Sequence, residues 1–346
     1  MAYSQLQHEI YAQPQVTKAI LAQRPVIRQI ADVIQQYQPR FVMIAARGTS
    51  DNAARYAQYL LGIALGWPVA LATPALGTLY HANVRLEGAL VIGISQSGRS
   101  PDICDVVQRA RAQGALTLAI TNNPESRLAQ TAAHHIDICA GPELSVAATK
   151  SYTNQLTAIA LLVAALTNDA TLESALDGLP GLFDGVLALP QVTIDAAAQV
   201  LGSAPAAISV GRGLQYATAF EAALKIKELS GLPVEPYSSA DVLHGPVTIV
   251  EQGFPVLVTS DTGATCADMT ALLARFHHQS ARLLVVSNAS DHLEQATVAL
   301  PLPACDQRVA PIVAIATWQR VAHASASARG RDPDAPQGLT KITETR

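Results

Sequence analysis

The segment Ser95–Asp102 has the composition of an anion-binding turn. It follows the apolar run 89–94 and precedes a helical pattern, which predicts a strand, a tight turn and a helix N-terminus. The N–H groups of a helix start form a neutral cradle for a phosphate, which requires no metal. For any single serine, helix capping is the more ordinary explanation. Because four polar side chains share one turn, we expect a phosphate site formed by Ser95, Gln96, Ser97 and Ser100.

A second turn of this kind lies upstream. Residues 47–52 follow the apolar run 41–46 and offer Gly48, Thr49 and Ser50 at the start of another helical stretch. In open α/β sheets, ligands collect at the carboxyl ends of strands, so the two turns could converge on one pocket. The glycine spacing fits neither a Walker A loop nor the GxGxxG fingerprint. A small phosphorylated metabolite is therefore expected, with no nucleotide or other cofactor.

Acid–base chemistry is indicated further along the chain. Glu221, Lys225 and Glu228 have the spacing of neighbours on one helix face, where they can exchange protons. Spacing alone favours a solvated charged face over a catalytic one. His244 is followed by Gly245 and Pro246, which places it in a turn, and catalytic histidines often lie in turns.

The elements that position these residues recur along the chain. Arg47-Gly48 recurs as Arg212-Gly213, and Ser95 with Gly98 recurs as Ser260 with Gly263, each 165 residues later. A single offset that preserves the order of strand-end motifs predicts two copies of one α/β domain. The second turn carries Asp261, whose charge would repel a phosphate. We therefore assign phosphate binding to the first copy only.

The predicted fold class is α/β, with two tandem, doubly wound, parallel-sheet domains. We expect an N-terminal helical arm over 1–37, interrupted near Pro14 and Pro25, and an irregular C-terminal tail over 331–346 that covers the active site. The remaining boundaries are 38–166 for the first domain, 167–195 for a helical connection and 196–330 for the second domain. The strands are expected near 41–46, 89–94, 116–121, 135–139, 207–210, 255–259, 282–286 and 297–300.

Composition excludes several function classes. The net charge is -4 and the basic residues are scattered, which disfavours nucleic acid as a partner. The longest apolar stretch, 156–166, is shorter than the ~20 residues that cross a bilayer, and no signal peptide is recognised. The four cysteines form no CxxC pair and are interpreted as small buried residues in a reducing cytoplasm. We expect a cytoplasmic oligomer with no membrane partner.

Motifs along nearly the whole chain resemble the sugar isomerase (SIS) family. Within it, the chain is most similar to the isomerase half of glucosamine-6-phosphate synthase, also called glutamine-fructose-6-phosphate aminotransferase, and to stand-alone glucosamine-6-phosphate deaminases. The sequence of residues 46–53 resembles the deaminase branch more closely than the synthase. The motifs are His8–Pro14, Gly48-Thr49-Ser50, Ser95–Gly98, Val146–Lys150, Lys225–Glu228, His244-Gly245-Pro246 and Asp332–Lys341.

The resemblance implies a role for each matching residue. Glu228, beside Lys225, would carry a proton between C1 and C2 of an open-chain sugar, and His244 would assist ring opening from the neighbouring subunit of a homodimer. Lys341 would lie over the substrate, where a tail lysine can form a Schiff base with the ketose. The phosphate would contact Ser50, Ser95, Gln96, Ser97 and Ser100, and the sugar would contact Gly48, Thr49, Val146 and Ala148.

Departures from the family pattern define the expected reaction. The chain begins directly in the isomerase arm, without the amidotransferase half, so we expect glucosamine 6-phosphate and water to give fructose 6-phosphate and ammonia. Ala148 replaces a serine and Leu243 replaces a basic residue, which leaves galactosamine 6-phosphate and a fructosamine 6-phosphate open as substrates. A fructosamine-6-phosphate deglycase, a simple aldose–ketose isomerase and a non-catalytic sugar-phosphate sensor are the alternatives. Retention of the four proton-transfer residues speaks against the sensor.

Overall fold

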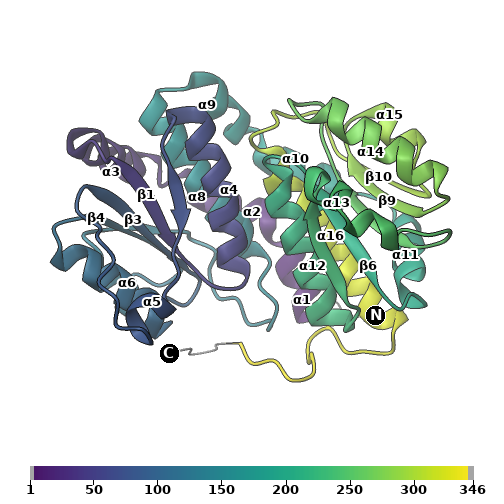
Figure 1. Cartoon of the computed structure of the whole chain (residues 1–346), viewed down its shortest axis with the longest axis horizontal. Coiled ribbons are helices and arrows are strands. Elements are labelled where there is room, and N and C mark those ends of the chain that lie inside the picture. Colours follow the sequence, from purple (N-terminus) through teal and green to yellow (C-terminus); the bar gives the residue numbers. More distant parts are fainter. Residues whose placement is uncertain (1–3, 342–346) are drawn as a thin grey trace. The chain divides into compact units, whose positions relative to one another are not determined.

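The computed structural model describes residues 4–341, which form two compact units (Figure 1). The first-sheet unit contains residues 15–143 and 150–177 together with Thr340 and Lys341. The second-sheet unit contains residues 4–14, 144–149 and 178–339. The short segment 144–149 and the first helix of the chain therefore belong to the second-sheet unit, although the first sheet lies between them in sequence.

The first-sheet unit contains a five-stranded parallel sheet in the order β2-β1-β3-β4-β5. Its strands are β1 (Phe41–Ala45), β2 (Val69–Leu71), β3 (Ala89–Ser95), β4 (Leu116–Thr121) and β5 (His134–Asp137). Every residue of β3 is buried, as expected for a parallel strand covered on both faces. One face is covered by α3 (Arg24–Tyr37), α4 (Thr49–Leu65) and α8 (Lys150–Thr167), and the other by α5 (Ala75–Thr78), α6 (Pro101–Ala112) and α7 (Arg127–Thr131). The helix α9 (Ala170–Asp177) packs against α8.

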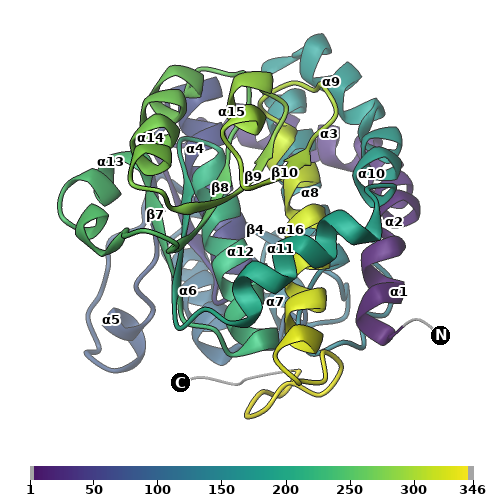
Figure 2. The same cartoon turned by 90° about the vertical axis from the view of Figure 1, so that its right-hand side faces the viewer.

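The second-sheet unit repeats this topology with the strand order β10-β9-β8-β6-β7. Its strands are β6 (Ala207–Gly211), β7 (Val234–Ser238), β8 (Pro255–Thr259), β9 (Arg282–Ser287) and β10 (Val298–Pro301). Figure 2 shows its helices α10 (Leu179–Leu187), α11 (Gln191–Gly202), α12 (Gln215–Ser230), α13 (Ser239–Leu243), α14 (Cys266–His278), α15 (Ser290–Glu294) and α16 (Ala310–Ala328). A 3-10 helix covers Pro246–Ile249. Because β1, β3 and β4 each have a counterpart at the same place in the second sheet, the predicted duplication is confirmed.

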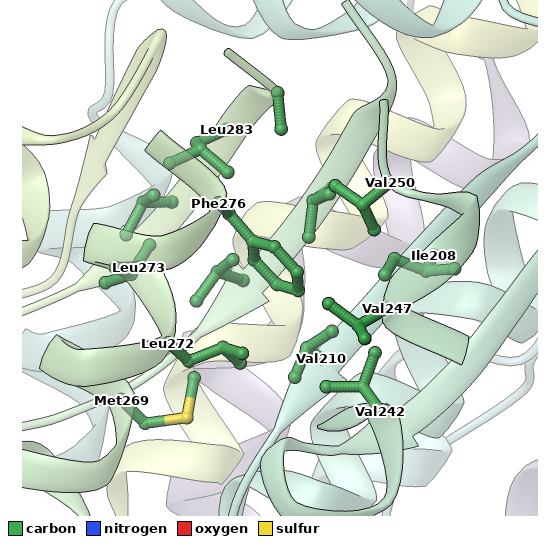
Figure 3. Close-up of a cluster of buried hydrophobic side chains, with 14 residues drawn as sticks. Ile208, Val210, Val242, Val247, Val250, Met269, Leu272, Leu273, Phe276 and Leu283 are labelled. Atoms are coloured by element: carbon green, nitrogen blue, oxygen red, sulfur yellow. The ribbon is translucent and has the colours of Figure 1, made fainter. Parts of the chain in front are cut away.

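The core of the second-sheet unit joins α14 to the sheet (Figure 3). Phe276 and Met269 of α14 are fully buried, and they belong to one apolar cluster with Ile208 of β6 and Val242 of α13. Burial of such side chains contributes about 1.5–3 kcal/mol each. This packing fixes β6, β8 and the turns that leave their carboxyl ends.

The N-terminal residues form three helices rather than one continuous helix. They are α1 (Gln5–Tyr11), α2 (Gln13–Leu21) and α3. Pro14 and Pro25 each stand in the first turn of a helix, where a missing N–H costs nothing, so the breaks fall just before them. Ser4 begins α1 with a capping box formed with Gln7.

The structure bears on two expectations from composition, the burial of the cysteines and the absence of a membrane span. Cys104 is buried, but Cys139, Cys266 and Cys305 are partly exposed, so the prediction of four buried cysteines is wrong for three of them. Within residues 4–341, no single helix has the length and apolar character of a membrane span, and only the bent pair α10 and α11 meets those criteria jointly.

Candidate active site

The two predicted turns of the first-sheet unit follow β1 and β3, which are hydrogen-bonded neighbours in the sheet. Strand order reverses at this position, where open α/β sheets bind ligands. Arg47 Nε in the first turn lies 2.9 Å from the buried carboxylate Oδ2 of Asp102 in the second. The structure therefore brings the two turns together, as the sequence predicted.

The turn after β3 contains a glycine in the left-handed backbone conformation. Gly98 adopts a positive φ of 63°, and a Cβ at this position would lie 2.2 Å from Ser126 Oγ, so only glycine fits. Ser95 Oγ accepts a hydrogen bond from the N–H of Gly98 at 3.1 Å. Ser50, in the first turn of α4, is buried and accepts a hydrogen bond from Gln155 Nε2 at 3.0 Å.

Helix capping does not account for the serines of this turn. Ser100 occupies the N-cap position of α6, but its side chain makes no capping hydrogen bond. Ser97 Oγ accepts a 3.4 Å hydrogen bond from the N–H of Arg99, outside the helix. The capping explanation that is ordinary for a single serine is therefore wrong for both residues.

The corresponding turn of the second repeat is occupied by the chain itself. The N–H of Gly263 donates to Asp261 Oδ1 at 2.8 Å, and the N–H of Ala264 donates to Gln307 Oε1 at 2.9 Å. The N–H of Thr262 donates to Asn288 Oδ1, also at 2.9 Å. Side-chain oxygens thus satisfy the amides that an anion would need. The backbone amides of this turn therefore already have hydrogen-bond acceptors within the chain.

The residues predicted to transfer protons from α12 surround one buried ammonium group. Lys225 Nζ lies 2.5 Å from Glu228 Oε2 and 3.4 Å from Glu221 Oε1. The Lys225 side chain is 1% exposed and that of Glu221 is 0% exposed, whereas that of Glu228 is 23% exposed. The solvated charged face that spacing alone favoured is therefore wrong. Glu228 is the one carboxylate of this cluster that a substrate can reach.

His244 stands at the C-terminus of α13, where its N–H donates to the carbonyl oxygen of Asp241. The histidine is exposed, and so are Leu243 before it and Ile249 after it, at 44% and 45%. The side chain of His244 is therefore exposed and does not belong to the core of the second-sheet unit.

The segment 144–149 alternates between buried and more exposed residues. Ser145, Ala147 and Thr149 are buried, whereas Val146 and Ala148 are half-buried. The two residues predicted to contact the sugar thus share the outer face of this segment.

Lys341 of the C-terminal tail lies within the first-sheet unit. Its Nζ is 3.1 Å from Oε2 of Glu143, a carboxylate with a fully buried side chain. The same carboxylate accepts hydrogen bonds from the N–H and the Oγ of Ser151 in α8, at 3.0 and 2.7 Å. Glu143 could not be recognised from the sequence, because its partner lies almost two hundred residues away.

No group of three or more His, Cys, Asp or Glu side chains within residues 4–341 is arranged to hold a metal ion. The polar groups gathered at the two turns are hydroxyls, amides and one Arg–Asp pair, which suit an oxyanion.

A tandem pair of parallel five-stranded α/β domains defines the class of this protein. The model of the SIS domain family matches residues 37–165 and 201–321. The chain belongs to the SIS domain family.

The chain is similar to an isomerizing aminotransferase and to a phosphosugar isomerase. A glutamine–fructose-6-phosphate aminotransferase (isomerizing) from Thermococcus kodakarensis is 31% identical over 96% of this chain and 56% of its own length. This chain thus spans just over half of the curated relatives that it matches. A solved structure from Silicibacter pomeroyi, assigned as a phosphosugar isomerase, is 36% identical with a TM-score of 0.86, over 96% of this chain and 100% of that one.

Two further solved structures share the architecture. The C-terminal domain of glucosamine-fructose-6-phosphate aminotransferase from Francisella tularensis has a TM-score of 0.87 at 26% identity, over 97% of this chain and 99% of that one. Glucosamine-6-phosphate deaminase from Thermotoga maritima has a TM-score of 0.76 at 19% identity, over 99% and 100%, and this likeness concerns the fold alone.

Proposed function

We propose that this chain is a phosphosugar isomerase of the deaminating type, which converts glucosamine 6-phosphate and water into fructose 6-phosphate and ammonia. The observation that carries the proposal is the α12 cluster, in which the buried ammonium of Lys225 holds the partly exposed carboxylate of Glu228. A sugar-phosphate sensor needs a phosphate cradle but no such proton-transfer pair. The relatives named as phosphosugar isomerases and isomerizing aminotransferases support the same class of chemistry.

The proposed reaction begins with opening of the sugar ring, assisted by His244. Glu228 then removes the proton from C2 of the aldehyde form and returns it to C1, through an enolamine. The C2–N bond becomes an imine in this transfer, water adds to C2, and the C–N bond breaks to leave a ketone and ammonia. In the proposal Lys225 orients Glu228. Lys341 would attack C2 of the imine before water does, which releases ammonia and leaves a Schiff base that water then hydrolyses to the ketone and the free lysine.

The phosphate is assigned to the first-sheet unit. The hydroxyl groups of Ser50, Ser95, Ser97 and Ser100 and the amide of Gln96 would hold it, with Gly48 and Thr49 at the same turn. These contacts act on the ground state and on the transition state alike, so they set affinity rather than turnover.

We also propose that the working form is a homodimer to which each chain contributes His244. The support is the exposure of this histidine within a turn that also exposes Leu243 and Ile249. Mixing an inactive Glu228→Gln chain with an inactive His244→Ala chain should restore part of the activity, because one site of the mixed dimer has both residues intact.

The first experiment measures ammonia and fructose 6-phosphate released from glucosamine 6-phosphate, with galactosamine 6-phosphate in parallel and no metal added. Equimolar release of both products, lost in Glu228→Gln, is the expected result. Interconversion of aldose and ketose without ammonia would identify a simple isomerase, and release from a fructosamine 6-phosphate alone would identify a deglycase. Binding without turnover would identify a sensor.

A further inference from the structure

A buried carboxylate from α1 holds the start of the segment 144–149. Glu9 is 2% exposed, and its Oε1 accepts a hydrogen bond from the N–H of Leu144 at 2.5 Å. The N–H of Ser145 lies 3.3 Å from both Glu9 oxygens. Gln5 Nε2 donates to Oε1 at 3.1 Å. All these residues belong to the second-sheet unit.

The end of the same segment is held by α16. Gln319 Nε2 donates to the carbonyl oxygen of Thr149 at 3.4 Å, and Gln319 Oε1 accepts from Gln13 Nε2 at 3.0 Å. Both glutamines are buried. The six residues are therefore fixed at both ends by buried polar side chains of α1, α2 and α16.

This two-ended attachment determines which side chains face outward. Successive side chains along the segment alternate between buried and more exposed, and the attachments at its two ends hold Val146 and Ala148 on the more exposed face. A hydrogen bond to a charged acceptor is about twice as strong as a neutral one. Glu9 is the carboxylate that binds this segment, and it does so through the backbone N–H groups of Leu144 and Ser145.

We propose that Glu9 is a positioning residue for sugar recognition: it fixes the segment 144–149 so that its outer face meets the carbon skeleton of the substrate. The inference rests on the proposed function, because that function places a sugar at Val146 and Ala148. Glu9 itself touches no substrate. It is expected to affect discrimination between a sugar phosphate and bare phosphate, because the phosphate residues belong to the first-sheet unit, to which Glu9 does not belong.

The test compares Glu9→Gln with the control Ser4→Ala. Glutamine keeps the shape of the side chain but has a single acceptor oxygen and turns an N–H₂ group toward the amides of Leu144 and Ser145. Ser4→Ala removes the N-cap of α1 and its 3.0 Å contact with His323 Nε2, so it loosens the same helix without touching the segment. Dissociation constants for inorganic phosphate and for glucosamine 6-phosphate are measured by calorimetry on each full-length protein.

We expect Glu9→Gln to lower the preference for glucosamine 6-phosphate over phosphate by about 10-fold or more, with phosphate affinity unchanged. Hydrogen exchange in the ligand-free protein should become faster at residues 144–149. Glu9→Asp keeps the charge on a shorter side chain and should give an intermediate preference, which also serves if Glu9→Gln does not fold.

An unchanged preference in Glu9→Gln, or an equal loss in Ser4→Ala, would overturn the positioning role. Binding is measured rather than turnover, so the two proposals can fail separately. A protein that releases no ammonia but loses its sugar preference in Glu9→Gln would refute deamination and support the role of Glu9.

Discussion

Glu228 and Glu221 flank the same lysine, so their amide variants form a matched pair that separates catalysis from stability. Each substitution, Glu228→Gln or Glu221→Gln, removes one negative charge beside Lys225 and keeps the shape of the side chain. The Glu228 side chain is 23% exposed and that of Glu221 is 0% exposed, so only Glu228 can meet a substrate. We expect the two variants to fail in different ways.

The magnitudes follow from these positions. Loss of a general base costs about 10²–10⁴-fold in rate, so kcat of Glu228→Gln should fall by that factor while KM changes little. Such a fall corresponds to about 3–5 kcal/mol of transition-state stabilisation. Glu221→Gln weakens a buried 3.4 Å ion pair, and the loss should be about 1.5–3 kcal/mol of the free energy of unfolding, as for a contact to a charged group. Lys225 still keeps Glu228 in that variant, so a complete loss of the fold is not expected.

The assays are steady-state ammonia release and urea unfolding followed by circular dichroism. Both variants should lower the unfolding midpoint, because both weaken a contact to the buried Lys225 ammonium. Glu228→Gln alone should lose turnover, whereas Glu221→Gln should retain most of its kcat. A kcat of Glu228→Gln within tenfold of the unmodified protein would refute the assignment of the base. An equal fall of kcat in the two variants would show that the rate depends on Lys225 and not on a base at Glu228.

Two other predictions concern the phosphate turn and the buried histidines. Ser97→Ala should raise KM for the sugar phosphate by about 2- to 10-fold at unchanged kcat, because a hydroxyl–phosphate contact acts equally on both states, and an unchanged KM would exclude the contact. Burial lowers the pKa of His292, His135 and His323 below 6.5. Just below pH 6.5 the folded protein therefore binds fewer protons than the unfolded protein. The stability that comes from keeping these histidines neutral is complete above pH 6.5 and is lost as the pH falls below it. The urea midpoint should therefore drop between pH 7.5 and 5.5, and less steeply in His292→Gln, whereas parallel curves would show that His292 does not contribute.

The central strands could be predicted because parallel strands covered on both faces consist of continuous apolar runs. Eight of the ten strands were expected from such runs, with β3 and β4 placed to within one residue of their observed ends. The two that were missed, β2 and β7, are edge strands of their sheets. β2 has three residues, too few to show a period, and β7 contains Pro236, which is tolerated only where one side of the strand has no ladder partner.

The site could be predicted only where neighbouring residues in sequence act together. The serines of residues 95–100 could be selected because several polar residues lie in one short turn. The α12 cluster could be selected because its residues have helical spacing. Burial of Lys225 could not be inferred, because nothing local distinguishes a buried charged face from a solvated one. The contacts of Glu9 and Glu143 could not be predicted either, since their partners are a distant backbone segment and a distant tail lysine.

The occupied turn of the second repeat bears on how the two halves came to differ. After a duplication, both turns would have offered the same amides to the same ligand. The second turn now has its own acceptors in Asp261, Asn288 and Gln307, so its fold no longer depends on any ligand. A single substitution at Asp261 would leave the N–H of Ala264 bonded to Gln307 and that of Thr262 bonded to Asn288. The turn of the second repeat is therefore expected to tolerate the loss of any one of its acceptors, because three different side chains supply them.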